Sequence, residues 1–246
     1  MPDPSAPSPA WQRQLWPRFC RLFWLKCGGT TLIMFVFFAA YFQVLRHPAY
    51  ALTPMPLTSV DALIPFYPPA LLMYASLWLY VPLPAALLLG LRELLAFGCW
   101  VVGLCITGLL IFYFWPTTLA PYAIDRSPYW GFDILHGIDA AANACPSLHV
   151  ATATFAFFWL NRVIRDMHTG GMARIFNGLW FIAIAYSTLA TKQHVFLDVA
   201  AGFALGAAFA WLSLRRRQTV SWETWRRPRS GKARGDQHRV VAAEGE

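Results

Sequence analysis

Charged residues are scarce in this sequence. Asp, Glu, Lys and Arg make up 13% of its 246 residues, whereas soluble domains carry about a quarter. Apolar residues reach 57%, and the mean hydropathy is +0.44. This composition argues against a soluble globular domain and against a disordered chain. It indicates an integral membrane protein with one folded domain.

Cysteine patterns are absent as well. The five cysteines form no CxxC pair and have no zinc-ligand spacing, which argues against a disulfide framework and a structural zinc site. Four of them fall in or beside apolar stretches, where cysteine mostly behaves as a small hydrophobic residue.

Long apolar runs are plentiful. A membrane-spanning helix needs about 20 mostly apolar residues, and six stretches qualify. They lie at about residues 27–45, 66–83, 94–115, 147–160, 175–190 and 195–214. We therefore predict an all-α integral membrane protein built as a bundle of six transmembrane helices. The fourth and fifth stretches are short, which favours helices whose ends are shielded by protein or line a wet cavity.

The basic residues are unevenly distributed around these spans. If the N-terminus is cytoplasmic, all but three of the 20 Lys and Arg residues fall in cytoplasmic segments. The positive-inside rule then predicts that both termini are cytoplasmic. The net charge of +8 sits where membrane insertion alone would place it, so no nucleic-acid partner is expected.

These patterns divide the chain into three parts. Residues 1–26 are a disordered, basic cytoplasmic lead, which is not a signal peptide because the first apolar run is long and has no cleavage site after it. Residues 27–214 form the membrane domain. Residues 215–246 are a basic cytoplasmic tail.

Ionisable residues gather on the predicted outer face. The loop before the fourth span carries Arg126, His136 and Asp139, and His149 follows at the start of that span. Lys192, His194 and Asp198 lie between and within the last two spans. Because ionisable groups at membrane depth are costly, their default interpretation is a functional site.

The spacing of these residues suits phosphoryl transfer. Pro146 favours a helix start, which would put Ser147 and His149 in the first turn, where backbone N–H groups attract anions. His194 and Asp198 are four residues apart, so they share one face of a helix. A carboxylate beside an imidazole fixes its tautomer and frees the other nitrogen as a nucleophile or base. We expect a phosphoryl-transfer site that needs no metal or cofactor.

These residues carry a family resemblance. The sequence resembles the type-2 phosphatidic acid phosphatase superfamily, whose signature is Pro-Ser-x-His followed by Ser-Arg-x5-His-x3-Asp. Residues 146–149 match the first block, and Ser187, His194 and Asp198 match the second. The residue patterns PSLHV and TKQH, together with FWPT at 114–117, are most similar to those of the branch of inositolphosphorylceramide synthases and sphingomyelin synthase relatives.

The resemblance implies roles for the residues. His194 would attack phosphorus and form a phosphohistidine, Asp198 would orient it, and His149 would protonate the leaving oxygen. The family's Lys-x6-Arg-Pro block is absent, and Thr188 stands at the arginine of the second block. The phosphate is therefore expected to be bound by other groups, with these candidates: Ser147, Ser187, Lys192 and Arg126.

Several alternatives stay open. Water would make the protein a lipid phosphohydrolase, whereas an alcohol acceptor would make it a headgroup transferase, for example of an inositolphosphotransferase type. A metal-dependent hydrolase could use His136, Asp139, His149, His194 and Asp198 as ligands. A non-catalytic lipid carrier or transporter could line a cavity with the same groups. A bacterial inner membrane with a periplasmic site is the expected setting, with a Golgi lumen as the eukaryotic equivalent. The expected partners are a lipid phosphate and the bilayer, and the sequence does not indicate an oligomeric state.

Overall fold

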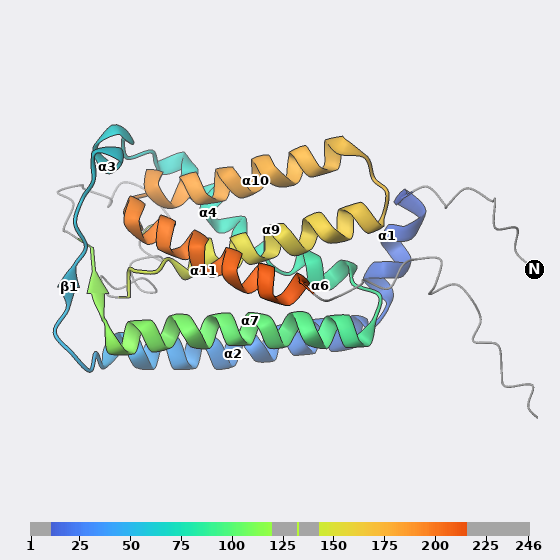
Figure 1. The fold of residues 1–246 in the computed structure, drawn as a ribbon, viewed down its shortest axis with the longest axis horizontal. Helices are drawn as coiled ribbons and strands as arrows, with labels where there is room; N and C mark the ends of the chain where they lie inside the picture. Colours follow the sequence, from blue (N-terminus) through green and yellow to red (C-terminus); the bar gives the residue numbers. More distant parts are fainter. Residues whose placement is uncertain (1–10, 120–131, 133–142, 216–246) are drawn as a thin grey trace, which may run out of the picture.

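The regular structure of the protein is almost entirely helical (Figure 1). The computed structural model describes residues 11–119, 132 and 143–215. Five helical segments are long and apolar enough to cross a membrane, which confirms the all-α membrane class. They are α2 (Phe23–Arg46), the broken segment Pro68–Leu87, α7 (Leu91–Phe114), α10 (Gly171–Ala190) and α11 (Phe196–Leu214).

The remaining long helix of the bundle is α9 (Leu148–Asp166), which lies between α7, α10 and α11 (Figure 1) and is not one of these five segments. It is less apolar than the other five, but it is enclosed by them, and Val150, Ala151, Ala153 and Ala156 are completely buried. Small side chains allow the neighbouring helices to approach closely without a large apolar surface. The predicted bundle of six helices is therefore built around α9.

The expectation that the fourth and fifth spans are short is wrong. Helix α9 has 19 residues and α10 has 20. The prediction for α9 stopped where polar residues begin, but the helix continues to Asp166. Arg162 and Asp166 are one helical turn apart and form an ion pair of 3.7 Å, so the polar end of the helix carries its own charge partner.

The second predicted span is interrupted rather than continuous. It consists of the 3₁₀ turn η1 (Pro68–Ala70) and the short helices α4 (Leu71–Ala75), α5 (Leu77–Tyr80) and α6 (Leu83–Leu87). Proline lacks a backbone N–H and clashes with the preceding turn, so prolines 82 and 84 separate α5 from α6. Tyr80 ties this segment to the bundle by donating to Asn177 Oδ1 of α10 at 2.7 Å.

Helices α2 and α7 run side by side along one edge of the bundle (Figure 1). Helix α2 packs mainly against α7, and most of its apolar surface is exposed; Phe35, for example, is 73% exposed. Apolar side chains exposed on this scale on a membrane helix are the surface that lipid covers.

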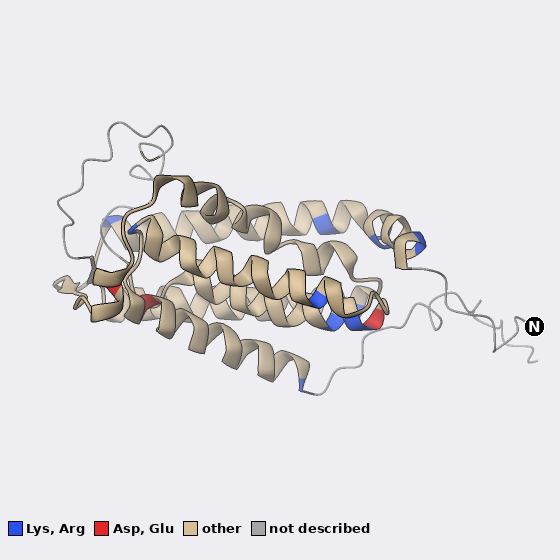
Figure 2. Cartoon of the chain, turned by 90° about the horizontal axis from the view of Figure 1, so that it is seen from above, with Lys and Arg blue, Asp and Glu red and all other residues tan. Residues whose placement is uncertain are grey.

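The two ends of the bundle differ in composition. Helices α9 and α11 both begin at the end that carries α3 (Ser59–Leu63) and the paired strands β1 (Thr53–Pro54) and β2 (Thr117–Thr118) (Figure 1). The described Lys and Arg residues gather mainly at the opposite end (Figure 2). That end also carries α1 and the end of α11, so the described chain starts and finishes there, as predicted. Which compartment each end faces stays a prediction.

The predicted disordered lead contains a helix, which corrects that part of the expectation. Helix α1 (Trp11–Cys20) packs against α6, and residues from 23 onward already belong to α2. Lys26 donates to the carbonyl oxygens of Arg18 and Ala86, each at 2.7 Å, and Arg18 donates to that of Leu87 at 3.1 Å. These cations satisfy carbonyls where α6 ends. Residues 1–10 and 216–246 lie outside the described part of the chain.

Candidate active site

The start of α9 and the start of α11 are joined by a backbone hydrogen bond. Ser147 N–H donates to the Asp198 carbonyl oxygen at 3.0 Å. A Cβ atom on Gly202 would collide with the Ser147 carbonyl oxygen, and one on Gly206 would collide with that of Ala151. Gly202-x3-Gly206 thus permits the two helices to approach closely. These glycines were not predicted from the sequence, although a GxxxG spacing in an apolar helix is a recognisable signal.

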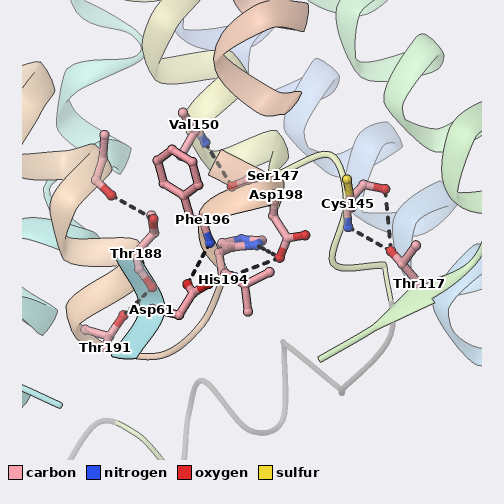
Figure 3. A network of polar contacts seen from close by, with 12 residues as sticks. Asp61, Thr117, Cys145, Ser147, Val150, Thr188, Thr191, His194, Phe196 and Asp198 are labelled. Atoms are coloured by element: carbon pink, nitrogen blue, oxygen red, sulfur yellow. Dashed lines mark hydrogen bonds and ion pairs between the residues drawn. The ribbon is translucent and has the colours of Figure 1, made fainter. Parts of the chain in front are cut away.

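His194 and Asp198 lie side by side, as predicted (Figure 3). The expected shared helix face is wrong, because α11 begins only at Phe196 and His194 lies in the turn before it. His194 Nδ1 lies 3.5 Å from Asp198 Oδ2, and the Asp198 side chain is 0% exposed, compared with 12% for His194. Asp198 Oδ2 also accepts the Val195 N–H at 3.1 Å, which caps α11. A carboxylate at Nδ1 favours the tautomer that carries its proton there, which leaves Nε2 with a free lone pair.

Asp198 has a second neighbour, Cys145. Burial, the negative charge of Asp198 and a hydrogen bond to it raise the pKa of the Cys145 thiol to about 11. The Cys145 N–H donates to Thr117 Oγ1 at 2.8 Å (Figure 3). Thr117 thereby connects the FWPT stretch to the Pro-Ser-Leu-His block, and the neutral thiol adds no charge beside the carboxylate.

His149 lies in the first turn of α9, as expected, and stacks on Tyr74 of α4. The two ring centroids are 4.0 Å apart with an angle of 22° between the planes. His149 Nε2 is buried and has no hydrogen-bond partner among the described residues. The stack fixes the ring plane, while Nε2 retains its capacity to exchange a proton.

The two serines of the motif blocks are both completely buried. Ser147 caps α9, and its Oγ accepts the Val150 N–H at 3.2 Å. Ser187 Oγ donates to the Ile184 carbonyl oxygen of its own helix at 2.6 Å. Ser147 therefore lies where the start of α9 meets the start of α11, whereas the hydroxyl of Ser187 is engaged within α10.

Lys192 lies beside the His194 turn but is already engaged. Its Nζ donates to the carbonyl oxygens of Asp61 at 2.8 Å and Ile64 at 2.5 Å, and burial lowers its pKa. Asp61 itself accepts the Phe196 N–H at 2.8 Å and was not identified from the sequence. The signal was present, because Thr58-x-x-Asp61 has the spacing of a capping box.

Three predicted residues, Arg126, His136 and Asp139, lie outside the described residues. Within residues 11–119, 132 and 143–215, no group of three or more His, Cys, Asp or Glu side chains could hold a metal ion. What the described residues do bring together is two imidazoles and a buried carboxylate at one end of the bundle.

Comparison with known proteins agrees with this arrangement. Residues 104–222 match the PAP2 superfamily. The match runs from α7 past the end of α11, so it includes both motif blocks and both histidines. It supports the type-2 phosphatidic acid phosphatase superfamily and a lipid phosphatase or phosphotransferase type of function. No curated protein and no solved structure matches the chain.

Proposed function

We propose that the protein is a metal-independent lipid phosphohydrolase or phosphotransferase that acts through a phosphohistidine on His194. The observation that carries this proposal is the pairing of His194 Nδ1 with the completely buried Asp198, 3.5 Å apart. The free Nε2 of His149 supports it, because the second imidazole lies in the first turn of the adjoining helix.

In the first step, His194 Nε2 attacks the phosphorus of a lipid phosphate. The N–P bond forms as the bond between phosphorus and the leaving oxygen breaks. His149 Nε2 gives its proton to that oxygen, and Asp198 stabilises the positive charge that develops on His194. The 3.5 Å contact between His194 and Asp198 is long for a hydrogen bond, but such contacts often tighten only when substrate binds.

In the second step, an acceptor oxygen attacks the same phosphorus while the N–P bond breaks. His149, now neutral, takes the proton from the acceptor. If the acceptor is water, phosphate is released; if it is an alcohol such as ceramide or diacylglycerol, a new phospholipid forms. The resemblance of residues 146–149 and 191–194 to the sphingolipid synthase branch favours testing the second outcome.

The phosphate oxygens need donors close to both histidines. The first N–H groups of any helix lack intrahelical partners, and in α9 the Ser147 side chain takes only that of Val150. The start of α9 can therefore bind the phosphate next to His149. We propose three further contributors to phosphate binding. They are Lys192, which adds positive charge, Ser187 on α10, and Arg126 in the loop before α9. We place this site at the periplasmic face of a bacterial inner membrane.

The test is a turnover assay in lipid–detergent micelles with EDTA present. Phosphatidic acid, phosphatidylinositol and a polyprenyl diphosphate serve as donors, each with and without ceramide or diacylglycerol. The variant His194→Ala removes the nucleophile, and His47→Ala is the matched control, since His47 is exposed and lies outside the site. We expect a loss on the order of 10⁴-fold or more for His194→Ala and none for His47→Ala.

The outcomes separate the alternatives. Free phosphate identifies a hydrolase, and a new phospholipid identifies a transferase. Loss of wild-type turnover in EDTA would favour the metal-dependent alternative. Equal turnover in wild type and His194→Ala, or no turnover of any donor, would contradict the proposal and leave a lipid carrier.

The role of His149 has a separate test. In His149→Ala we expect turnover of phosphatidic acid to fall about 10²- to 10⁴-fold. A donor whose leaving group needs no proton, such as a nitrophenyl phosphate ester, should recover most of the rate of the first step. An equal loss with both donors would mean that His149 is not the general acid.

A further inference from the structure

The turn that carries His194 is unusually well fixed. After α10 ends, Lys192 N–H donates to the Leu189 carbonyl oxygen at 3.1 Å, and Gln193 N–H donates to that of Thr188 at 3.1 Å. This pair of bonds is the Schellman arrangement that ends many helices. His194 N–H donates to the same Thr188 oxygen at 3.2 Å, so the backbone before the imidazole is held by α10.

The residue at the left-handed position of this turn is a lysine. Lys192 has φ +55°, where glycine is favoured and another residue costs about 1–3 kcal/mol. Its ammonium donates to the carbonyl oxygens of Asp61 and Ile64. The side chain therefore provides a link to α3 and its following residue that a glycine could not provide.

Asp61 completes this link from the other side (Figure 3). Its Oδ1 accepts the Phe196 N–H at 2.8 Å, two residues after His194. Its Oδ2 accepts both the N–H and the hydroxyl of Thr58, each at 2.7 Å. Asp61 thus joins the cap of α3 to the first turn of α11, across 135 residues of sequence.

The charge on Asp61 suits this position. Burial raises its pKa, but the hydrogen bonds from Thr58 and Phe196 and the charge of Lys192 outweigh burial and hold the pKa below its ordinary value of 3.8. The group is therefore ionised at neutral pH, and a carboxylate at a helix N-terminus is stabilising.

We propose that Asp61 is a positioning residue for His194, which it holds by binding the Phe196 N–H while Lys192 binds α3 in return. This inference rests on the proposed function of His194. Val195 N–H is bound by Asp198 and Phe196 N–H by Asp61, so the backbone directly after the imidazole is fixed by two carboxylates. Catalysis is sensitive to displacement of a reacting group by about 1 Å.

The decisive variant is Asp61→Asn in the full chain. An amide has one acceptor oxygen where Asp61 uses two, so the variant cannot keep both Thr58 and Phe196. We expect kcat with phosphatidic acid to fall about 10- to 100-fold, with KM within about twofold. Thr58→Ala weakens the cap of α3 but leaves the Phe196 contact, and its kcat should stay within about twofold of wild type.

Two further measurements keep the proposal falsifiable. Tyr80→Phe breaks the hydrogen bond to Asn177 far from the site and controls for general destabilisation, with all assays run well below each melting temperature. Hydrogen exchange of the peptide that contains residues 191–198 should accelerate in Asp61→Asn and not in Tyr80→Phe, whatever the activity of the protein.

Each result has a distinct meaning. Equal losses of kcat in Asp61→Asn and Thr58→Ala, or unchanged exchange at 191–198, would overturn the positioning role and leave Asp61 as the cap of α3. If His194→Ala keeps full turnover, the proposed function fails instead, and the exchange experiment still reports whether Asp61 holds the turn.

Discussion

Charged side chains bind backbone groups at both ends of the bundle, but the α3 end uses carboxylates as well as a lysine. At the α1 end, Arg18 and Lys26 donate to carbonyl oxygens that the broken helix α6 leaves unpaired. At the α3 end, Asp61 and Asp198 accept N–H groups at the start of α11. Both devices satisfy buried backbone groups, whose unpaired state would cost about 1–3 kcal/mol each.

The two ends differ in the number of buried side-chain atoms that have no hydrogen-bond partner. Among the described residues, the α3 end contains most of the buried side-chain atoms without a hydrogen-bond partner: Asn143 Nδ2, His149 Nε2, His194 Nδ1 and Asp198 Oδ1. Toward the α1 end the corresponding atoms are two: Arg18 Nε, on a guanidinium whose other nitrogens are bound, and Asn161 Oδ1 in the last turns of α9. Unsatisfied buried groups on titratable side chains are typical of sites that bind and react. The α3 end therefore has the unpaired titratable groups that the proposed function requires, whereas no unpaired His or Asp atom is found among the described residues of the α1 end.

The largest expected effect that tests this comparison is at Asp198. Asp198→Asn keeps the size of the side chain and its cap on Val195 but removes the charge that orients His194. We expect kcat to fall about 10²- to 10⁴-fold with little change in melting temperature. Asp166→Asn, at the far end of α9, is the control that should retain full turnover. A fall in melting temperature that accounts for the lost activity would make Asp198 structural.

The next effect concerns the approach of α11 to α9. Gly202→Ala places a methyl group against the Ser147 carbonyl oxygen, so the helices must separate and the two histidines move apart. We expect kcat to fall about 10- to 100-fold. Gly178→Ala on α10 has open space around its Cβ and should leave activity unchanged. Equal kinetics for the two variants would show that the close approach does not position the histidines.

Features that depend on neighbouring residues could be predicted from the sequence, whereas contacts between residues far apart in the chain could not. The helices were predictable because apolar length is a local property. The His194–Asp198 pair was predicted from helical i, i+4 spacing, but the contact forms between the turn before α11 and the first turn of that helix. The Asp61–Phe196 contact joins residues 135 positions apart, so no local pattern reveals it. Prolines 82 and 84 indicate an interrupted helix, but the apolar stretch was predicted as one continuous span. The end of α9 was predicted too early because its charged residues indicate the end of an apolar span. The ion pair between Arg162 and Asp166 lowers the energetic cost of these charges, so the helix continues to Asp166.

A matched pair of lysines sharpens the comparison further. Lys26 and Lys192 each donate to two backbone carbonyl oxygens, at opposite ends of the bundle. We expect Lys26→Met to lower the melting temperature by a few degrees, for a loss of about 1–3 kcal/mol, with kcat per folded molecule unchanged. Lys192→Met should lower kcat as well, because the His194 turn loses its link to α3.

Lys192→Gly distinguishes the two contributions of that lysine. Glycine relieves the strain of the left-handed backbone at φ +55° but removes the ammonium. If the link to α3 matters, the Gly and Met variants lose similar kcat. If only the shape of the turn matters, the Gly variant retains wild-type kcat. A rise in KM without a fall in kcat in both variants would assign Lys192 to phosphate binding instead.

The smallest expected effect is the pH dependence of stability at Asp61. Because its pKa in the folded protein lies below the ordinary 3.8, the ionised form adds stability that is fully present above that ordinary value. This contribution is lost as the pH falls through the lower, folded-state pKa. The difference in melting temperature between wild type and Asp61→Asn should therefore shrink below about pH 4. The difference between wild type and Lys26→Met should not change over the same range, because an amine stays protonated throughout. Parallel behaviour of the two differences would mean that Asp61 does not stabilise the α3 end through its charge, and the contrast between the two ends would then rest on hydrogen-bond geometry alone.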